Sequence, residues 1–454
     1  MKVFGSSGTR GVANEELTPS FVLRVAKAAG TAWGTDRVAL ARDTRHTGRM
    51  LADAAASGLA STGTDIDRLG IVPTPGAQFY AEREGVPTIV ITASHNPPQY
   101  NGVKLVGADG VELAVADLEE IEQTLLGETF TVAPWHETGR VRTVDGVRDD
   151  YVAELLAHVD RERIADAELT VALDPGHGAG SLTSPEFFRK LGCRVITVNG
   201  QADGHFPGRD PEPVSDNLTD LGRLVETTDA DIGIAHDGDA DRAIFFDENG
   251  TYIEGDATFA ALAEAELEAG DVTVSAVNVS QRLVDVATDV GANLELTPIG
   301  STNIITRIEE LQANERHVPI AGEGNGGIFF PSFRLARDGA YTAARFLELV
   351  ADRPVSDIVA PYDGYANVRR NIEYESTAER DAMLDAAANQ AQAADAELNT
   401  RDGYRLDYGD AWVLARPSGT EPLVRIYAEA RDETRANALV HEMYEALETA
   451  KTSV

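Results

Sequence analysis

Short runs of β-branched and aliphatic residues alternate along most of the chain with longer stretches rich in alanine, leucine and glutamate. Runs of the first kind predict buried strands and stretches of the second kind predict helices, as near Met50–Leu59 and from Ser280 onward. The predicted strands are RVALARD (37–43), PTIVITA (87–93), ELTVALDP (168–175), DADIGIA (229–235), DVTVSAVNV (271–279) and HVPIA (317–321). This alternation predicts an α/β chain with largely parallel sheets.

The predicted strands fall into three pairs, and a polar loop follows the second strand of each pair. These loops are TASHNPPQYNGVK (92–104), DGDADR (237–242) and GEGNGG (322–327). The pattern therefore predicts one strand–helix–strand plan used three times. Ligands of open α/β sheets gather at the carboxyl ends of the strands, which is where all three loops fall.

The pattern changes after Ala360. Strands are predicted at 367–375, 410–416 and 423–430, and helices at 376–398 and 433–450. These elements predict a smaller α+β unit, with the segment at 352–365 as its link to the rest. The resulting division is 1–150, 151–252, 253–362 and 363–454.

The composition narrows the environment and the partners. The chain has 454 residues, 75 acidic against 39 basic, and a net charge of -36. The lysines are Lys2, Lys27, Lys104, Lys190 and Lys451. An acidic surface poor in lysine suggests a halophile, whose fold depends on salt to screen self-repulsion. A basic face for nucleic acid is not visible.

Cysteine usage and hydropathy indicate the compartment. Cys193 is the only cysteine, which excludes an internal disulfide and favours a reducing environment. The opening MKVFGSSGTRG does not resemble a signal peptide, and no apolar run is long enough to span a bilayer. We expect a soluble, cytoplasmic protein that is not bound to membranes.

The DGDADR loop places Asp237, Asp239 and Asp241 at alternate positions. Three carboxylates that close repel one another unless a cation lies between them, and hard oxygen ligands suit Mg²⁺ or Ca²⁺. A calcium-binding EF-hand is disfavoured, because Arg242 stands where a glycine is required and strands flank the loop. A solvated acidic turn is the remaining alternative.

The loop at 92–104 combines a hydroxyl nucleophile, Ser94, with His95 and Lys104, which could orient it and carry a proton. Pro97 and Pro98 stiffen the turn. A structural turn with a capping serine is the alternative. The absence of a G-x-S-x-G motif disfavours a hydrolase, and the three aspartates point to metal-assisted phosphoryl transfer.

The GEGNGG loop fits G-x-G-x-x-G, but a strand follows it where a dinucleotide site needs a helix. We interpret Glu323 and Asn325 as polar groups held out by glycines, with a plain turn as the alternative. A fourth loop, RPSGTEPLVR (416–425), has the composition of a phosphate nest. Its candidate ligands are Arg416, Ser418, Gly419, Thr420 and Arg425. An ordinary hairpin turn is the alternative there. Arg10, which lies among glycines in GSSGTRG, is a further candidate, and a simple turn is the alternative for that segment.

The motifs T-A-S-H-N-P-P-x-x-N-G-x-K, D-G-D-A-D-R, G-E-x-N-G-G and R-P-S-G-T-E-P, in this order, resemble the α-D-phosphohexomutase family. The resemblance covers essentially the whole chain and includes FGSSGTRG. It implies three similar α/β domains with mixed, largely parallel sheets, plus a smaller C-terminal α+β domain, around a central cleft. It also implies interconversion of hexose or hexosamine 6- and 1-phosphates through a phosphoserine and a sugar bisphosphate.

The resemblance assigns roles to individual residues. Ser94 would be the phosphoserine, and Asp237, Asp239 and Asp241 would hold one Mg²⁺ together with a Ser94 oxygen. Glu323 and Asn325 would bind sugar hydroxyls. The reacting end would be lined by Arg10, His95, Lys104 and Arg242, and the other phosphate would be bound by Arg416, Ser418, Gly419, Thr420 and Arg425.

The chain departs from the family pattern in the sugar loop, where many relatives have serine and histidine in place of Asn325 and Gly327. A histidine role in proton transfer therefore does not carry over. The loop forms resemble archaeal members, which favours phosphoglucosamine over phosphomannose or phosphoglucose as the substrate. A magnesium-dependent sugar phosphatase and a non-catalytic sugar-phosphate binder are further alternatives, and the assembly is expected to be a monomer or homodimer.

Overall fold

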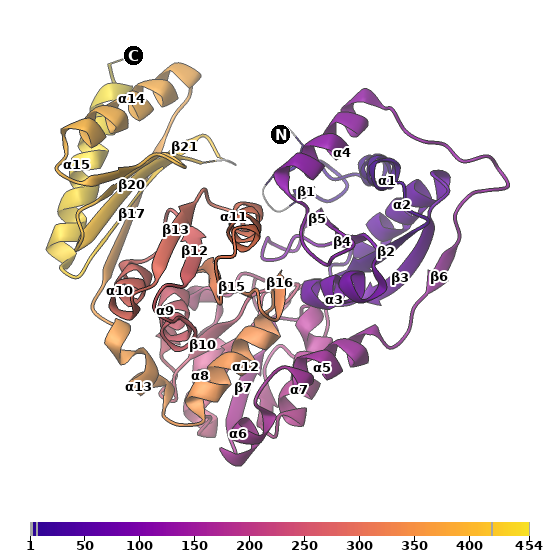
Figure 1. Cartoon of the computed structure of the whole chain (residues 1–454), viewed down its shortest axis with the longest axis horizontal. Coiled ribbons are helices and arrows are strands. Elements are labelled where there is room, and N and C mark those ends of the chain that lie inside the picture. The colour runs from indigo at the N-terminus through magenta and orange to yellow at the C-terminus, as the bar shows by residue number, and fades with distance from the viewer. Residues whose placement is uncertain (1–2, 6–7, 419–420, 454) are drawn as a thin grey trace.

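The computed structural model describes residues 3–5, 8–418 and 421–453 of the chain. Four sheets follow one another along the sequence, each with its own helices, and Figure 1 shows them arranged in an arc with the N- and C-terminal units facing each other. We call the units built on these sheets the first to fourth domains. The predicted fold class is confirmed.

The first domain has a six-stranded sheet in the order β1-β5-β4-β2-β3-β6. Strand β2 pairs in parallel with β3 and β4, and the β4–β5 and β5–β1 pairs are antiparallel. Its elements are β1 (Thr9–Val12), α1 (Pro19–Trp33), β2 (Arg37–Arg42), α2 (Gly48–Ser61), β3 (Asp65–Ile71), α3 (Thr74–Glu84), β4 (Thr88–Ile91), β5 (Tyr100–Val106), α4 (Val115–Gly127) and β6 (Val141–Thr143).

The second domain has a five-stranded sheet in the order β11-β10-β9-β7-β8, with β7 parallel to β8 and β9. Its elements are α5 (Val147–Ala157), α6 (Arg161–Asp166), β7 (Thr170–Asp174), η1 (Ala179–Leu182), α7 (Ser184–Lys190), β8 (Arg194–Thr197), η2 (Ser215–Asn217), α8 (Thr219–Thr228), β9 (Ile232–Ala235), β10 (Ile244–Phe246) and β11 (Tyr252–Ile253).

The third domain has the sheet order β13-β12-β14-β15-β16, with β12 parallel to β13 and β14. Its elements are α9 (Gly255–Glu266), β12 (Val272–Ala276), α10 (Gln281–Val290), β13 (Asn293–Thr297), α11 (Ser301–Ala313), β14 (Ala321–Glu323), β15 (Gly327–Phe330), β16 (Arg334–Arg337), α12 (Gly339–Val350), α13 (Val355–Val359) and η3 (Ala360–Tyr362).

The three sheets share one plan. A central strand pairs in parallel with two neighbours, and the second of these, β4, β9 or β14, turns back through an antiparallel hairpin. The sequence pattern identified the central strand and the hairpin strand of each domain. It missed the strand that lies between these two in the sequence. These strands, β3, β8 and β13, are half-exposed and carry charged residues.

The fourth domain is a fully antiparallel sheet in the order β17-β21-β20-β19-β18, against which two helices pack. The predicted strands and helices are all present, and β18 and β19 are additional. Its elements are β17 (Ala366–Glu373), α14 (Thr377–Ala393), β18 (Glu397–Asn399), β19 (Tyr404–Asp407), β20 (Ala411–Pro417), β21 (Leu423–Ala430) and α15 (Glu433–Lys451).

The cores show which domains form one body. The second and third domains share one buried apolar cluster, in which the rings of Phe245 and Phe346 lie 4.6 Å apart. The fourth domain has its own core around α14 and α15. It meets the third domain through a small cluster of Val277, Trp412 and Leu414. The second and third domains are therefore joined far more extensively than the third and fourth.

The predicted link at 352–365 contains two short helices, α13 and η3. Val355, Ile358, Val359 and Tyr362 have helical spacing and are buried in the shared core. The predicted domain boundaries at 150, 252 and 362 stay predictions, although α5 and β11 extend across the first two. Within the described ranges, no helix is long and apolar enough to cross a membrane.

Candidate functional site

The three polar loops occupy the same place in the three repeated sheets. Each loop is the turn of an antiparallel hairpin, formed by β4 and β5, by β9 and β10, or by β14 and β15. Each follows the carboxyl end of a strand that is parallel to the central one. The shared plan therefore brings together segments that lie far apart in the sequence.

Ser94 lies at the contact between the first two loops. Its backbone has a positive φ of 50°, an unusual conformation for serine, and its N–H donates to Thr92 Oγ1 at 2.9 Å. The hydroxyl donates to Asp237 Oδ2 of the second domain at 2.6 Å, and the residue is only 1% exposed. The hydroxyl is thus aimed directly at the aspartate loop.

The aspartate loop approaches the serine loop so closely that Gly238 has to be glycine. A Cβ on Gly238 would stand 2.6 Å from the carbonyl oxygen of Ser94. The predicted triplet, Asp237, Asp239 and Asp241, is fully buried, and one carboxylate oxygen of each lies within 4.8 Å of those of the other two.

Neighbouring charges distinguish Asp237 from Asp241. Burial, together with Asp241 and Asp239 nearby, raises the pKa of Asp237 well above its ordinary value. Burial would also raise the pKa of Asp241, but Arg337 and Lys104 outweigh it and lower that pKa well below the usual range. Asp237, the carboxylate beside Ser94, therefore has less compensation from neighbouring cations than Asp241.

The donor set fits a hard divalent cation. Asp239 Oδ1 and Asp241 Oδ1 are buried and accept no hydrogen bond from the described residues, although Arg242 Nε lies 3.9 Å from Asp241 Oδ1. Thr74 Oγ1 donates to Asp239 Oδ2 at 2.6 Å. Buried carboxylate oxygens that accept no hydrogen bond are costly unless a cation contacts them. The flanking elements are strands β9 and β10, so the site is not an EF-hand.

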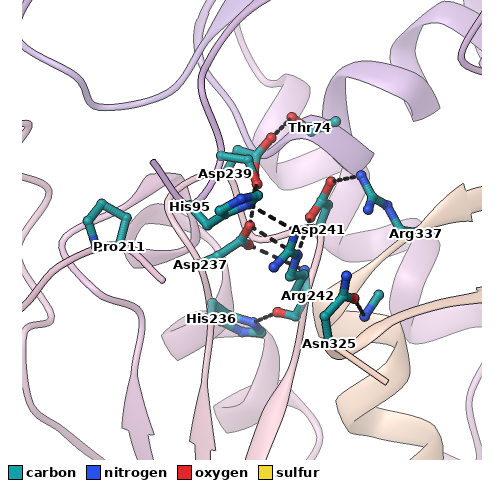
Figure 2. A network of polar contacts seen from close by, with 12 residues as sticks. Thr74, His95, Pro211, His236, Asp237, Asp239, Asp241, Arg242, Asn325 and Arg337 are labelled. Carbon is teal, nitrogen blue, oxygen red and sulfur yellow. Dashed lines mark hydrogen bonds and ion pairs between the residues drawn. The ribbon is translucent and has the colours of Figure 1, made fainter. Parts of the chain in front are cut away.

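His95, Arg242 and Arg10 lie around the serine. Arg242 Nη2 donates to His95 Nδ1 at 2.9 Å (Figure 2). That ring nitrogen lies 3.4 Å from Ser94 Oγ. The charge of Arg242, reinforced by burial, lowers the pKa of His95 far below its ordinary value, so the ring is neutral. Arg10 Nη1 donates to Asn96 Oδ1 at 2.9 Å, so Arg10, from β1, lies against the same loop.

Lys104 belongs to a buried quartet of charges that joins three domains. Its ammonium lies 3.0 Å from Glu112 Oε1 and 3.2 Å from Asp241 Oδ2. Arg337 Nη2, from β16, donates to Asp241 Oδ2 at 2.7 Å and lies 3.7 Å from Glu112 Oε1. Burial lowers the pKa of Lys104, but Glu112 and Asp241 raise it above its ordinary value, so the lysine is protonated.

Sequence reasoning missed Thr74, Glu112 and Arg337. Arg337 ends a strand next to a capping aspartate, and Glu112 follows the Lys104 strand, but neither has a motif of its own. Their importance comes from contacts between domains. Glu112 Oε2 also accepts from Ser301 Oγ at 2.9 Å, so this carboxylate ties the first domain to the start of α11.

The sugar loop has its own internal bonds. Asn325 Nδ2 donates to Glu323 Oε2 at 3.4 Å, and Asn325 Oδ1 accepts from the N–H of Gly327 at 3.0 Å. Gly327 leaves room for Arg337, because a Cβ there would stand 2.8 Å from Arg337 Cδ. Figure 2 shows Asn325 and Arg337 on the side of the network that faces Asp241 and Arg242.

Glu323 and Asn325 line a cavity of about 310 Å³ that lies between the domains. The second domain contributes Glu212 and Arg242 to it, and the fourth contributes Asn367, Arg369 and Tyr427. The sugar loop and Arg242, next to the serine, therefore open onto one cleft that the fourth domain closes.

The predicted phosphate loop lies in the fourth domain, between β20 and β21. Arg416 and Arg425 stand directly opposite each other in this pair, and like charges placed so repel unless an anion joins them. Arg416 also contacts Asp402 at 3.1 Å, and Arg425 contacts Glu421 at 2.6 Å. Ser418 accepts from the N–H of Glu421, and Gly419 and Thr420 lie outside the described residues.

The structure thus gathers Ser94, His95, Lys104, Arg10 and Arg242 with the three aspartates. Glu323 and Asn325 lie next to this group through Arg337. No hydrogen bond or ion pair between described residues connects Arg416 or Arg425 with it. The phosphate loop is a separate element on the fourth domain.

Comparison with known families matches four models in the order of the four domains. They describe domains I, II and III of phosphoglucomutase/phosphomannomutase, each alpha/beta/alpha, and its C-terminal domain. The matched residues are 1–132, 149–250, 254–365 and 370–446.

Individual proteins agree with these matches. A phosphoglucomutase/phosphomannomutase of Thermococcus kodakarensis is 40% identical over 99% of both chains. A phosphoglucosamine/phosphogalactosamine mutase of Sulfurisphaera tokodaii is 36% identical, over 98% of this chain and 99% of the relative. A solved phosphoglucomutase/phosphomannomutase family protein of Burkholderia thailandensis has a TM-score of 0.85 at 28% identity, covering 99% and 97% of the two chains. The chain therefore belongs to the phosphoglucomutase/phosphomannomutase family, the α-D-phosphohexomutases.

Proposed function

We propose that this phosphohexomutase carries its transferable phosphoryl group on Ser94 and passes it between the 1- and 6-oxygens of a hexosamine or hexose phosphate. The observation that carries the proposal is the 2.6 Å bond from the Ser94 hydroxyl to Asp237, one of three buried aspartates from another domain. A nucleophile held against a metal-type carboxylate set is the arrangement that phosphoryl transfer requires.

In the first transfer, the P–O bond to Ser94 Oγ breaks and a bond to the free sugar hydroxyl forms, which gives a sugar bisphosphate. The proton lost by the attacking hydroxyl is balanced by the one that Ser94 Oγ gains as its P–O bond breaks, and the second transfer returns the other phosphoryl group to Ser94. A single Mg²⁺ bound by Asp237, Asp239, Asp241 and a Ser94 oxygen would supply charge neutralisation. Added sugar bisphosphate would act as an activator, because it phosphorylates Ser94 in enzyme that has lost the group.

The remaining residues of the reacting end would position the phosphoryl group and the attacking oxygen. Arg10 and Arg242 can neutralise phosphoryl oxygens, as their contacts with the serine loop place them beside Ser94. His95 is neutral, and because its Nδ1 accepts from Arg242 Nη2 and lies 3.4 Å from Ser94 Oγ, it would orient these two groups. Lys104 is protonated, and its ammonium, 3.2 Å from Asp241 Oδ2, would supply positive charge beside the aspartate loop during the transfer.

Substrate binding would use both sides of the cleft. Glu323 and Asn325 can hydrogen-bond the sugar hydroxyls, and Arg416, Ser418, Gly419, Thr420 and Arg425 would bind the phosphate that is not reacting. The bisphosphate has to turn end over end between the two transfers. The small interface between the third and fourth domains supports opening of the cleft for this step.

Glucosamine phosphate is our first choice of substrate, with mannose and glucose phosphates as broad-specificity alternatives. The Sulfurisphaera tokodaii relative, a phosphoglucosamine/phosphogalactosamine mutase, supports the first choice. The Thermococcus kodakarensis relative, a phosphoglucomutase/phosphomannomutase, supports the alternatives. We expect a phosphosugar as the only partner, a cytoplasmic monomer or homodimer, and no binding to nucleic acid or membranes. A magnesium-dependent phosphatase would use the same nucleophile, but would release phosphate instead of isomerising the sugar.

The test is a comparison of initial rates with glucosamine, mannose and glucose 1-phosphates at high salt, with Mg²⁺ and a bisphosphate activator. Isomerisation of all three, fastest with glucosamine phosphate, supports the proposal. Because Glu323 and Asn325 would read hydroxyls that these sugars share, a preference above about 10⁴-fold in kcat/KM would refute this assignment of the sugar loop. Phosphate release without isomerisation would identify a phosphatase.

A further inference from the structure

Arg45 follows β2 and has no part in the motifs described above, yet it is fully buried against the serine loop. We infer that Arg45 is a positioning residue that seals the Ser94 loop against the second domain, so that the phosphoryl group on Ser94 passes to the sugar and not to water. This inference rests on the proposed phosphoserine.

Every N–H of the Arg45 guanidinium is used. The group has five donors, and the structure gives it five bonds. Nε donates to Asp43 Oδ2 at 3.0 Å, Nη1 donates to the carbonyls of Pro97 at 2.7 Å and Tyr100 at 2.9 Å, and Nη2 donates to the carbonyls of Ser94 at 2.8 Å and Asn96 at 2.6 Å. One side chain thus holds four carbonyl groups of the catalytic loop.

Asp43, the carboxylate partner of Arg45, helps to fix the backbone N–H of Ser94 through Thr92. Asp43 Oδ1 accepts from the backbone N–H of Arg45 at 2.9 Å, and Asp43 Oδ2 accepts from Thr92 Oγ1 at 2.8 Å. Thr92 Oγ1 in turn accepts from the N–H of Ser94. The N–H and the carbonyl of Ser94 are therefore both fixed by this group, which holds the residue in its left-handed conformation.

The same residue also lies against the domain that carries the aspartates. The Arg45 guanidinium lies 5.2 Å from the ring centre of Phe206, and Arg45 forms a backbone bridge with Gly204. Thr44 Oγ1 donates to the carbonyl of His177 at 3.0 Å. Arg45 therefore fixes the loop to two domains at once, at the contact where Ser94 Oγ meets Asp237.

The chemical consequence concerns the fate of phosphoserine between transfers. The P–O bond to Ser94 Oγ can break by attack of a sugar hydroxyl, which gives the bisphosphate, or by attack of water, which gives inorganic phosphate and free Ser94 hydroxyl. Exclusion of water decides between them, and Ser94 is 1% exposed in this structure. A loosened loop would admit water and would also misplace the serine oxygen.

Lysine at position 45 cannot make the five hydrogen bonds of the Arg45 guanidinium. An ammonium has three donors and no planar fork, so Arg45→Lys leaves at least two of the five acceptors without their partner. Arg49→Lys is the matched control, because Arg49 is exposed, lies four residues away, and makes no hydrogen bond or ion pair with another described residue.

The experiment uses the full-length enzyme with Mg²⁺, hexose 1-phosphate and limiting bisphosphate, and measures inorganic phosphate released per sugar isomerised. For Arg45→Lys we expect kcat to fall about tenfold or more with little change in KM, and the release ratio to rise by at least about tenfold. More bisphosphate should be needed to sustain turnover. Arg49→Lys should match the wild type.

A second variant separates this role from a general loss of folding. Arg45→Ala should have the same high release ratio, and added methylguanidinium should lower it by refilling the space of the lost side chain. A wild-type release ratio in folded Arg45→Lys would overturn the inference, as would failure of Arg45→Lys to fold at any temperature, which would leave only a structural role. Phosphorylation of the wild type, measured in parallel, tests the proposed function itself.

Discussion

Arg337 Nη2 donates to Asp241 Oδ2 at 2.7 Å, so a strand of the third domain holds an aspartate of the second-domain loop. The same guanidinium lies 4.0 Å from Glu323 of the sugar loop. Asp241 and Glu112 raise the pKa of Arg337 above its ordinary value although burial opposes this. Arg337 therefore links the candidate metal site to the candidate sugar site.

Replacing Arg337 with methionine should leave Asp241 and Glu112 with Lys104 as their main cation. We expect the free energy of unfolding, measured in EDTA, to fall by about 3–5 kcal/mol, the usual cost of breaking a buried ion pair. Mg²⁺ should raise the Tm of Arg337→Met more than that of the wild type, because the metal replaces part of the lost charge. Equal Mg²⁺-induced shifts in Tm would contradict this reading of the Arg337–Asp241 contact.

Buried His236 should make the fold sensitive to acid. Its Nδ1 lies 2.8 Å from the carbonyl of Arg242, and burial, the largest cause, lowers its pKa to about 4. The unfolded chain binds a proton near pH 6.5 and the folded chain only near 4, so stability is full above pH 6.5 and falls between these values.

The loss attributable to His236 should be about 3 kcal/mol over that range. Denaturant unfolding of His236→Gln in EDTA should therefore be less dependent on pH between 6.5 and 4 than unfolding of the wild type. His441→Gln, at an exposed position of α15, is the control and should keep the wild-type slope. If all three proteins have the same slope, the histidine is not the cause.

Much of the site could be predicted from local sequence. The glycines and aspartates of 237–242, the serine loop and the hairpin strands around them follow local patterns, and each is present in the structure. Arg45, Glu112 and Arg337 could not be predicted, because their partners belong to other loops or other domains. Such contacts depend on how the domains dock, and that is encoded in no single segment.

In the fold, too, local patterns could be predicted, whereas features that depend on contacts with other segments could not. The half-exposed strands β3, β8 and β13 were missed because their mixed polarity does not differ from that of a surface loop. The apolar spacing of Val355, Ile358, Val359 and Tyr362 is visible in the sequence, but it does not show which surface these side chains pack against. The conformation of that segment depends on the surface that it packs against, which is the shared core of the second and third domains.

Removing one candidate metal ligand should weaken cation binding without unfolding the protein. Asp239→Asn keeps an acceptor for Thr74 Oγ1 and removes one negative charge from the triplet. We expect the Kd for Mg²⁺, measured by calorimetry, to rise by at least about tenfold, a loss that even outer-shell changes can cause. Asp220→Asn, at an exposed position of α8, should bind Mg²⁺ like the wild type. Unchanged affinity in Asp239→Asn would remove this residue from the metal site.

Salt should stabilise the fold. At a net charge of -36, self-repulsion is strong, and the Debye length falls from about 30 Å at 0.01 M to about 3 Å at 1 M salt. The Tm should therefore rise steadily from low to molar KCl. A Tm that does not change over this range would count against the halophilic interpretation of the composition.

The most direct test of the account is the covalent state of Ser94. After incubation with a hexose 1,6-bisphosphate and Mg²⁺, peptide mass spectrometry should find a single phosphoryl group on Ser94, and added hexose monophosphate should remove it as bisphosphate forms. Ser94→Ala should fold, acquire no phosphoryl group and lose mutase turnover. Phosphorylation at another residue, or full turnover by Ser94→Ala, would contradict the account.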